Sequence, residues 1–187
     1  MKFEPDHPVL KNGASVTIRK AVKKDAPALI ILKMEFVANC PFSTSSKGEF
    51  FPTKREEAAR IQQFNTHPAT LLLVATYREK IIGCLELKAE RKMKTCHNAL
   101  LGLVIAPKWQ NQGLGSVLLE QAINWGKTHP DLENLWLQVV ANHTQALYLY
   151  EKKGFKRTGR QPRYLKDTSG GYFDLLTLWL SVAEEQV

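Results

Sequence analysis

The chain has 187 residues, of which 44% are hydrophobic and 24% are charged. This is close to average globular usage, so it excludes a disordered chain and a fibrous repeat, and the length fits one domain over residues 1–187 with a core over about 15–181. Lysine and arginine number 26 against 18 acids, and the charge of +8 favours polyanions, whether nucleic acid, acidic lipid headgroups or a phosphorylated cofactor.

Several other classes of protein are disfavoured by the same reading. The basic residues are scattered with no run of five or more, so a solvated surface is favoured over a nucleic-acid track. The separations of Cys40, Cys84 and Cys96 match no zinc or CxxC spacing, which indicates reduced thiols, a cytoplasmic location and no metal. No apolar run approaches the ~18 residues of a membrane span, and the amino terminus lacks an apolar signal core, so no membrane partner is expected.

The first half of the chain predicts two helices set among three strands. Asp25 can cap a helix that carries Pro27 in its first turn. Thr53 and Glu56 have the spacing of a capping box. The expected elements, in chain order, are a strand over 16–19, a helix from 25 to near 39, a helix over 54–65, and antiparallel strands over 70–77 and 80–90.

The second half begins with residues 99–106, which are almost wholly apolar, as in a central strand covered by helices on both faces. A glycine turn at 110–115 then leads into a helix. Asn142 can cap a later helix, which Gly154 closes. The expected elements are a helix over 114–127, a strand over 135–140, the helix after 142, and strands over 155–158 and 172–180 joined by a Gly170-Gly171 turn.

The glycine turn is a candidate anion site, because a turn that leads from a buried strand into a helix directs unpaired backbone amides at one spot near the positive end of the helix dipole. A side chain at Gly113 or Gly115 would hold a phosphate away from the amides or demand an unfavourable backbone conformation. Ser116 follows where a nucleotide-hydrolysing P-loop needs lysine, and Leu118 stands where the dinucleotide fingerprint needs a third glycine. Two glycines alone fit a plain helix start equally well.

Two motifs resolve this ambiguity. Residues 110–115 follow the pattern Q/R-x-x-G-x-G/A directly after an apolar strand end. Residues 142–155 follow the pattern Asn-x-x-x-Ala…Leu-Tyr-Glu-Lys-x-Gly-Phe. In these motifs and in the order of elements over 16–180, the chain resembles the GNAT superfamily of acyl-CoA-dependent N-acetyltransferases.

The resemblance implies an α/β fold with a mixed, mostly antiparallel seven-stranded sheet flanked by helices, in which two central strands splay apart to admit the pantetheine arm of acetyl-CoA. It implies that amides around Gln112–Ser116 hold the pyrophosphate, and that main-chain groups of Val104 and Ile105 pair with the pantetheine arm opposite Asn142. The implied cofactor-binding residues are Val104, Ile105, Gln110, Asn111, Gln112, Gly113, Leu114, Gly115, Ser116, Asn142, Tyr148 and Tyr150.

Amide synthesis from a thioester needs a neutral amine, support for an oxyanion and a proton for the departing thiolate. The resemblance implies that Tyr150 is the general acid, with Tyr148 in reserve; the alternative is a core tyrosine. No glutamate stands where several family members keep one, since Gln138 fills one such position. Gln138 cannot take a proton, although it could orient a water or substrate, and a buried glutamine bonded to backbone is the alternative.

The lack of a glutamate base limits which amines can serve as the acceptor. A lysine-like amine with a pKa near 10.4 is only about one part in two thousand neutral at pH 7, whereas an α-amine with a pKa near 7.8 is about one part in seven neutral and loses only about 1 kcal/mol. The acceptor is therefore expected to be an α-amino group or a small amine of lowered pKa, unless Glu86 or Glu35 acts as a base through water. Glu86 alternates with leucines on a strand, so a solvent-facing carboxylate is the alternative.

The leading hypothesis is an N-acetyltransferase that moves an acetyl group from acetyl-CoA to a primary amine of a small molecule, peptide or protein, by direct attack in a ternary complex. A non-catalytic acyl-CoA-binding or sensing module is the alternative, and a nucleic-acid-binding domain is disfavoured because no such module appears. A homodimer is possible. The acceptor is expected to depend on the loops over 39–51 and 161–171.

Overall fold

One seven-stranded sheet forms the centre of the computed structural model, which describes residues 3–46, 48–49, 51–167 and 169–183. Its strand order is β1-β2-β3-β4-β5-β7-β6, and every neighbouring pair is antiparallel except β4 and β5, which are parallel. The mixed, mostly antiparallel sheet that the resemblance implied is confirmed. The strands are β1 (Thr17–Lys20), β2 (Thr70–Tyr77), β3 (Lys80–Ala89), β4 (Asn98–Ile105), β5 (Asn134–Val140), β6 (Lys156–Lys166) and β7 (Tyr172–Ser181).

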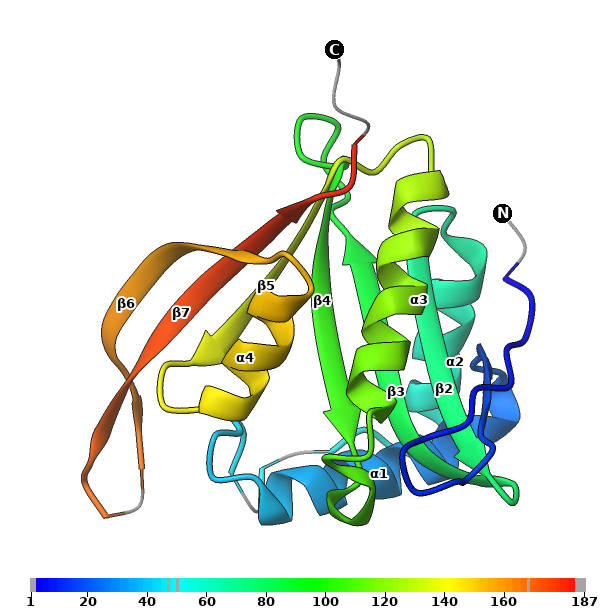
Figure 1. The fold of residues 1–187 in the computed structure, drawn as a ribbon, viewed down its shortest axis with the longest axis horizontal. Coiled ribbons are helices and arrows are strands. Elements are labelled where there is room, and N and C mark those ends of the chain that lie inside the picture. The colour runs from blue at the N-terminus through cyan, green and yellow to red at the C-terminus, as the bar shows by residue number, and fades with distance from the viewer. Residues whose placement is uncertain (1–2, 47, 50, 168, 184–187) are drawn as a thin grey trace.

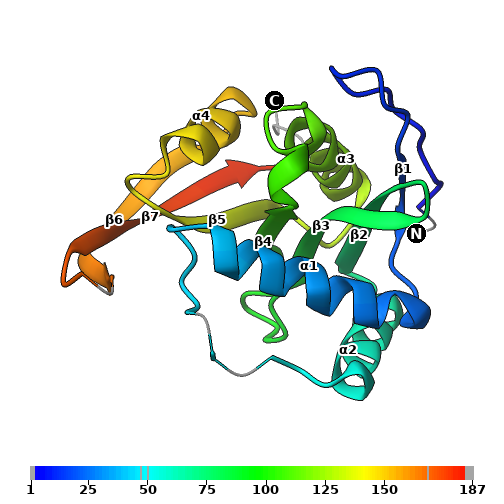
Figure 2. The same ribbon diagram turned by 90° about the horizontal axis from the view of Figure 1, so that it is seen from below.

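Helices cover both faces of this sheet (Figures 1 and 2). Helices α1 and α2 lie on one face, and α3 and α4 lie on the other. None of the helices within the described ranges has the length and apolar character needed to cross a membrane. The helices are α1 (Ala26–Asn39), α2 (Lys54–Thr66), α3 (Leu114–Thr128) and α4 (Thr144–Lys152), with 3-10 turns η1 (Lys23–Asp25) and η2 (Pro107–Trp109).

The alternation of side chains along the strands divides the core into two clusters. On β3, Leu85 and Leu87 pack toward α3, while Cys84 packs toward α1 and α2. Glu86 follows Cys84 at a spacing of two, so it shares the face that α1 and α2 cover. This assignment of faces decides which polar residues can meet.

The ends of the first two helices confirm one predicted cap and correct another. The capping box of α2 is present: the amide of Glu56 donates to Oγ1 of Thr53 at 3.3 Å, and the amide of Thr53 donates to Oε2 of Glu56 at 2.7 Å. Asp25 precedes α1 but its side chain caps no amide of that helix. Its carboxylate instead accepts two hydrogen bonds from Arg19, at 2.7 and 2.9 Å, because the ion pair draws it toward β1.

The predicted cap of α4 is also corrected. His143, not Asn142, is the N-cap residue, and its Nδ1 accepts a hydrogen bond from the amide of Ala146 at 3.1 Å. Asn142 lies one residue earlier with an exposed side chain, and only its carbonyl is used, by the amide of Thr144. The helix therefore begins one residue later than the asparagine suggested.

Strand β6 is much longer than the expected strand over 155–158, since it extends to Lys166. Its side chains are exposed along almost the whole length because it is the edge of the sheet, so no alternation of apolar residues marks it. Its pairing with β7 shifts register near Gly159 and again between Gln161 and Leu165, around Pro162. An exposed edge strand with a proline leaves no simple periodic signal.

Candidate active site

The neighbouring strands β4 and β5 separate soon after they begin (Figure 1). They pair over three positions only, the last being Leu100 with Trp136. Beyond that point Gly102 is exposed and residues 103–105 are partly exposed, although the sequence predicted a strand buried throughout. The expectation that helices cover the whole strand was wrong for this half of β4, whereas the separation of β4 from β5 agrees with the two splayed central strands that the resemblance implied.

The register of β4 against β3 decides which backbone groups face this separation. In an antiparallel ladder, alternate residues exchange hydrogen bonds with the partner strand, and the residues between them point the other way. Just beyond β4, the amide of Ala106 donates to the carbonyl of Ile82 at 2.9 Å, so two residues earlier Val104 also faces β3. Leu103 and Ile105 direct their backbone groups toward β5, whereas Val104, expected there with Ile105, does not.

The loop between η2 and α3 presents a run of unpaired amides. Six consecutive backbone N–H groups, from Asn111 to Ser116, donate a hydrogen bond to no atom of the described residues. Asn111 and Gly113 adopt positive φ values of 62° and 89°, which turn the chain sharply into α3. The helix dipole adds positive potential at the same point. The loop therefore offers an electropositive backbone surface of the kind that binds phosphate.

The two glycines of this loop are required for different reasons. Gly113 adopts the left-handed conformation that side chains disfavour, although a Cβ there would meet nothing closer than Lys11 at 3.7 Å. Gly115 lies in the first turn of α3, where a Cβ would approach Leu149 of α4 to 3.2 Å and Leu103 of β4 to 3.6 Å. The first glycine therefore permits the turn, and the second permits α3 and α4 to lie close together.

Two side-chain contacts hold the loop in place. Nε2 of Gln110 donates to the carbonyl of Ile105 at 3.3 Å, which ties the loop to the end of β4. The side-chain amide of Gln145, in the first turn of α4, donates to Oδ1 of Asn111. Gln145 thus links the two sides of the β4–β5 separation, and no pattern in the sequence singled it out.

Tyr150 lies on the inner face of α4, with its ring edge-on to Phe155 at a centroid distance of 5.9 Å. Burial raises the pKa of the Tyr150 hydroxyl to about 12, so the phenol is protonated at neutral pH. The hydroxyl makes no hydrogen bond with the described residues, and it retains some exposure to solvent. The side chain therefore combines a core ring with a free, protonated hydroxyl.

Three other predicted site residues lie at the surface. Tyr148 is 68% exposed on the opposite face of α4, where Lys152 lies over its ring at 6.0 Å. The side chains of Asn142 and Gln138 are exposed and make no hydrogen bond in the described part of the chain. Gln138 is therefore not a buried glutamine bonded to backbone, which removes that alternative.

Glu86 belongs to a four-residue ion-pair network that was not predicted from the sequence. Its carboxylate lies 3.0 Å from Nζ of Lys33 on α1 and 2.9 Å from the guanidinium of Arg60 on α2. The same two cations contact Glu57, which is wholly buried. Only the i, i+3 spacing of Glu57 and Arg60 could have indicated part of it. Glu86 also pairs across the sheet with Gly102, where a Cβ would meet empty space.

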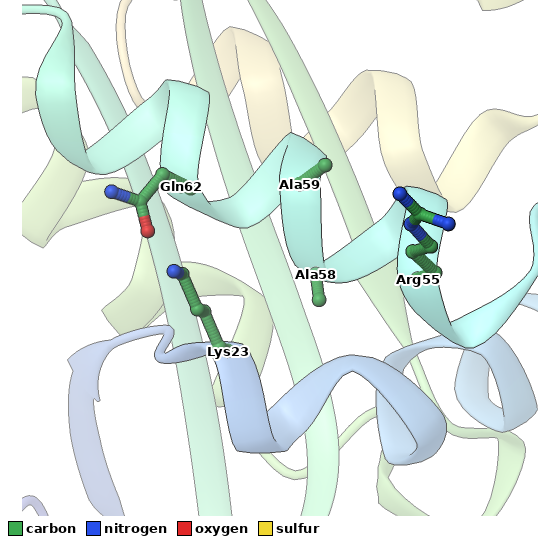
Figure 3. Close-up of a pocket in the computed structure, with 5 residues that line it drawn as sticks. All are labelled: Lys23, Arg55, Ala58, Ala59 and Gln62. Atoms are coloured by element: carbon green, nitrogen blue, oxygen red, sulfur yellow. The ribbon is translucent and has the colours of Figure 1, made fainter.

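Two hollows of the surface lie elsewhere. One, of about 340 Å³, lies between Lys23 of η1 and four residues of α2: Arg55, Ala58, Ala59 and Gln62 (Figure 3). No predicted site residue lines it. Over the described ranges, no group of three or more His, Cys, Asp or Glu residues is arranged to hold a metal ion.

The fold and the glycine loop are those of an acetyltransferase. The model of the acetyltransferase (GNAT) family matches residues 37–155. Because this match takes in more than half of the chain, the chain belongs to that family. The resemblance stated from the two motifs is confirmed.

Individual relatives agree with this assignment. An L-amino acid N-acetyltransferase of Escherichia coli, AaaT, is 25% identical over 107 residues, which are 57% of this chain and 65% of that protein. The chain thus spans just under two thirds of this relative's length. A GNAT acetyltransferase of Streptococcus pneumoniae has a crystal structure with a TM-score of 0.86 and 28% identity, covering 89% of this chain and 99% of that one. The structure of yncA from Salmonella typhimurium, which contains its cofactor acetyl-CoA, shares the fold at a TM-score of 0.80, with 18% identity over 92% of this chain and 96% of that one.

Proposed function

We propose that this chain transfers an acetyl group from acetyl-CoA to a primary amine, as a single catalytic domain. One observation carries the proposal: the six unpaired amides of residues 111–116 stand at the start of α3, beside the stretch of β4 that has no partner on β5. A phosphate-binding loop next to an unpaired strand edge suits a ligand that has a pyrophosphate at one end and an amide-bearing arm at the other. Family membership and the yncA complex support acetyl-CoA as that ligand.

The roles of the cofactor-binding residues follow from the backbone. The amides of residues 112–116 would hold the pyrophosphate, as expected from the sequence. Leu103 and Ile105, whose backbone groups face the separation, would pair with the amides of the pantetheine arm in place of Val104. The carbonyl of Ile105 already accepts from Gln110, which leaves its N–H as the available group. Acetyl-CoA supplies the acetyl group as a thioester.

Tyr150 would donate a proton to the departing thiolate, because its hydroxyl is protonated at neutral pH and unpaired. Direct attack by the amine needs no thiol nucleophile. Burial raises the pKa of Cys84 to about 12, which keeps that thiol protonated and unreactive. A ternary complex is therefore favoured over an acyl-enzyme.

The acceptor is an α-amino group in this proposal. Glu86 is held by two cations, Glu35 lies exposed on α1, and Gln138 cannot accept a proton, so in this proposal the amine loses its own proton readily. An α-amine does this at lower pH than a lysine side chain. The E. coli relative AaaT is named for L-amino acids, which supports the same class.

The test is thermal unfolding with and without acetyl-CoA, followed by a thiol-release assay against amino acids, short peptides, polyamines and N-α-acetyl-lysine. Acetyl-CoA at 100 times its Kd should stabilise the fold by about 2.7 kcal/mol through mass action. The α-amines should release CoA faster than N-α-acetyl-lysine at pH 7.5. Stabilisation without turnover of any amine would favour the acyl-CoA sensing module instead, and no stabilisation at all would refute both.

A further inference from the structure

A hairpin before β1 reaches the phosphate-binding loop. Bridges between Asp6 and Ile18 and between Val9 and Ser15 fold residues 6–15 back on themselves. Leu10 is only 5% exposed and packs in the same core cluster as the inner face of α3. Since a buried residue anchors the hairpin, the turn that follows Leu10 has a defined position at the surface.

Lys11, in that turn, contacts the loop in two ways. Its backbone amide donates to the carbonyl of Gln112 at 3.1 Å. Its Cγ and Cε lie 3.7 and 3.9 Å from the point where a Cβ on Gly113 would stand, so the side chain runs alongside the glycine. Lys11 is exposed and takes part in none of the ion pairs among the described residues. An unpaired cation therefore stands beside six unpaired amides.

The backbone contact also orients the loop. In a trans peptide the carbonyl oxygen and the next N–H point in opposite directions. Because the backbone amide of Lys11 holds the carbonyl of Gln112, the N–H of Gly113 is directed away from the Lys11 backbone, and the partly negative oxygen of Gln112 is kept from the anion. The side chain of Lys11 extends separately alongside Gly113. The hairpin thus fixes one of the amides on which phosphate binding depends.

We propose that Lys11 is a cofactor-binding residue whose ammonium pairs with the pyrophosphate of acetyl-CoA above Gly113, while its N–H orients the Gln112–Gly113 peptide. This inference rests on the proposed function, because it takes the loop as the pyrophosphate site. It adds a residue about one hundred positions away from the glycine motif, outside both sequence motifs.

The test compares Lys11→Met, which keeps an apolar stem beside Gly113, with Lys94→Met as a matched control. Lys94 is exposed in the loop that joins β3 to β4, at the far end of β4 from Ile105, so its loss changes the net charge equally. Calorimetric titration should show that K11M raises the Kd for acetyl-CoA by about three- to tenfold at 50 mM salt and by under about twofold at 500 mM, since salt screens an exposed pair. K94M should stay within about twofold of wild type at both salt concentrations.

Two ligand variants identify the group that Lys11 contacts. The K11M effect should persist with 3′-dephospho-acetyl-CoA, which keeps the pyrophosphate, and should vanish with S-acetylpantetheine, which has no phosphate. An effect that disappears with the dephospho compound would overturn the pyrophosphate assignment, and equal affinities of K11M and K94M would overturn the inference altogether. Wild-type protein that binds no acetyl-CoA would instead refute the proposed function, so the two failures are distinguishable.

Discussion

At the scale of single residues, Tyr150 shows how one side chain can be both structural and chemical. Its ring packs in the core against Phe155, and its hydroxyl remains free of hydrogen bonds with the described chain. The two interpretations left open by the sequence, a core tyrosine and a general acid, are therefore compatible. The ring positions the hydroxyl, and burial keeps it protonated.

Replacement of Tyr150 by phenylalanine separates the two roles. The ring and its packing remain, so the melting temperature and the Kd for acetyl-CoA should change little. Loss of the proton donor should lower kcat by about 10²-fold or more, the usual contribution of a general acid. Steady-state rates and a binding titration on the same variant check this, and a kcat within threefold of wild type would assign the hydroxyl no catalytic role.

At the scale of elements, α4 depends on an unusual cap. The neutral ring of His143 accepts a hydrogen bond from the amide of Ala146. It also contacts the ring of Phe42, in the loop after α1, at a centroid distance of 4.7 Å. Burial lowers the pKa of His143 below its ordinary value of 6.5, which favours the neutral form that caps the helix. The helix that carries Tyr150 is thus coupled to a titratable group.

His143→Ala should lower the free energy of unfolding by about 1 kcal/mol, because the cap is lost, and the melting temperature by about 2–4 °C. His143→Asn should restore most of this stability. Because the folded-state pKa is lowered, this stabilisation is present above the unfolded pKa near 6.5 and is lost as the pH falls through the folded value. Relative to the asparagine variant, wild type should therefore lose stability between pH 7.5 and 5.5. A constant difference over that range, measured by thermal unfolding, would contradict the capping role.

At the scale of the whole molecule, the ion-pair network joins three elements across the sheet face. Lys33 comes from α1, Glu57 and Arg60 from α2, and Glu86 from β3. Burial alone would raise the pKa of Glu57, but the hydrogen bond from Arg60 and the charge of Lys33 hold it below its ordinary value. The network therefore ties both helices to the sheet and fixes Glu86.

Glu57→Gln should lower the free energy of unfolding at pH 7 by about 3 kcal/mol, because it leaves two cations with one carboxylate in a buried site. Glu133→Gln, at an exposed position, is the control and should stay within about 0.5 kcal/mol of wild type. The lowered pKa means that the stabilisation by Glu57 is present above about pH 4.3 and is lost as the pH falls through the folded value. Urea unfolding should show the E57Q deficit shrinking toward pH 3.5, and a deficit that is independent of pH would refute the ionic explanation.

The order of the elements, the capping box at Thr53 and the glycine turn before α3 could be predicted from the sequence alone. Each of these depends on residues within a few positions of one another, so local propensity and spacing suffice. The strand over 155–158 was misjudged because an exposed edge strand has no alternation of apolar residues. The cap at Asn142 was misjudged because a histidine cap has no common motif.

Three features of the site became visible only in the folded molecule: β5 leaves β4 after Leu100, Leu103 rather than Val104 faces the separation, and Lys11 lies against Gly113. These facts join residues far apart in the chain and depend on strand register, where a shift of one residue exchanges the two sides of a strand. Register is set by the packing of whole layers, so no local pattern carries it, and the groups that bind and react are brought together only when the helices pack on both faces of the sheet.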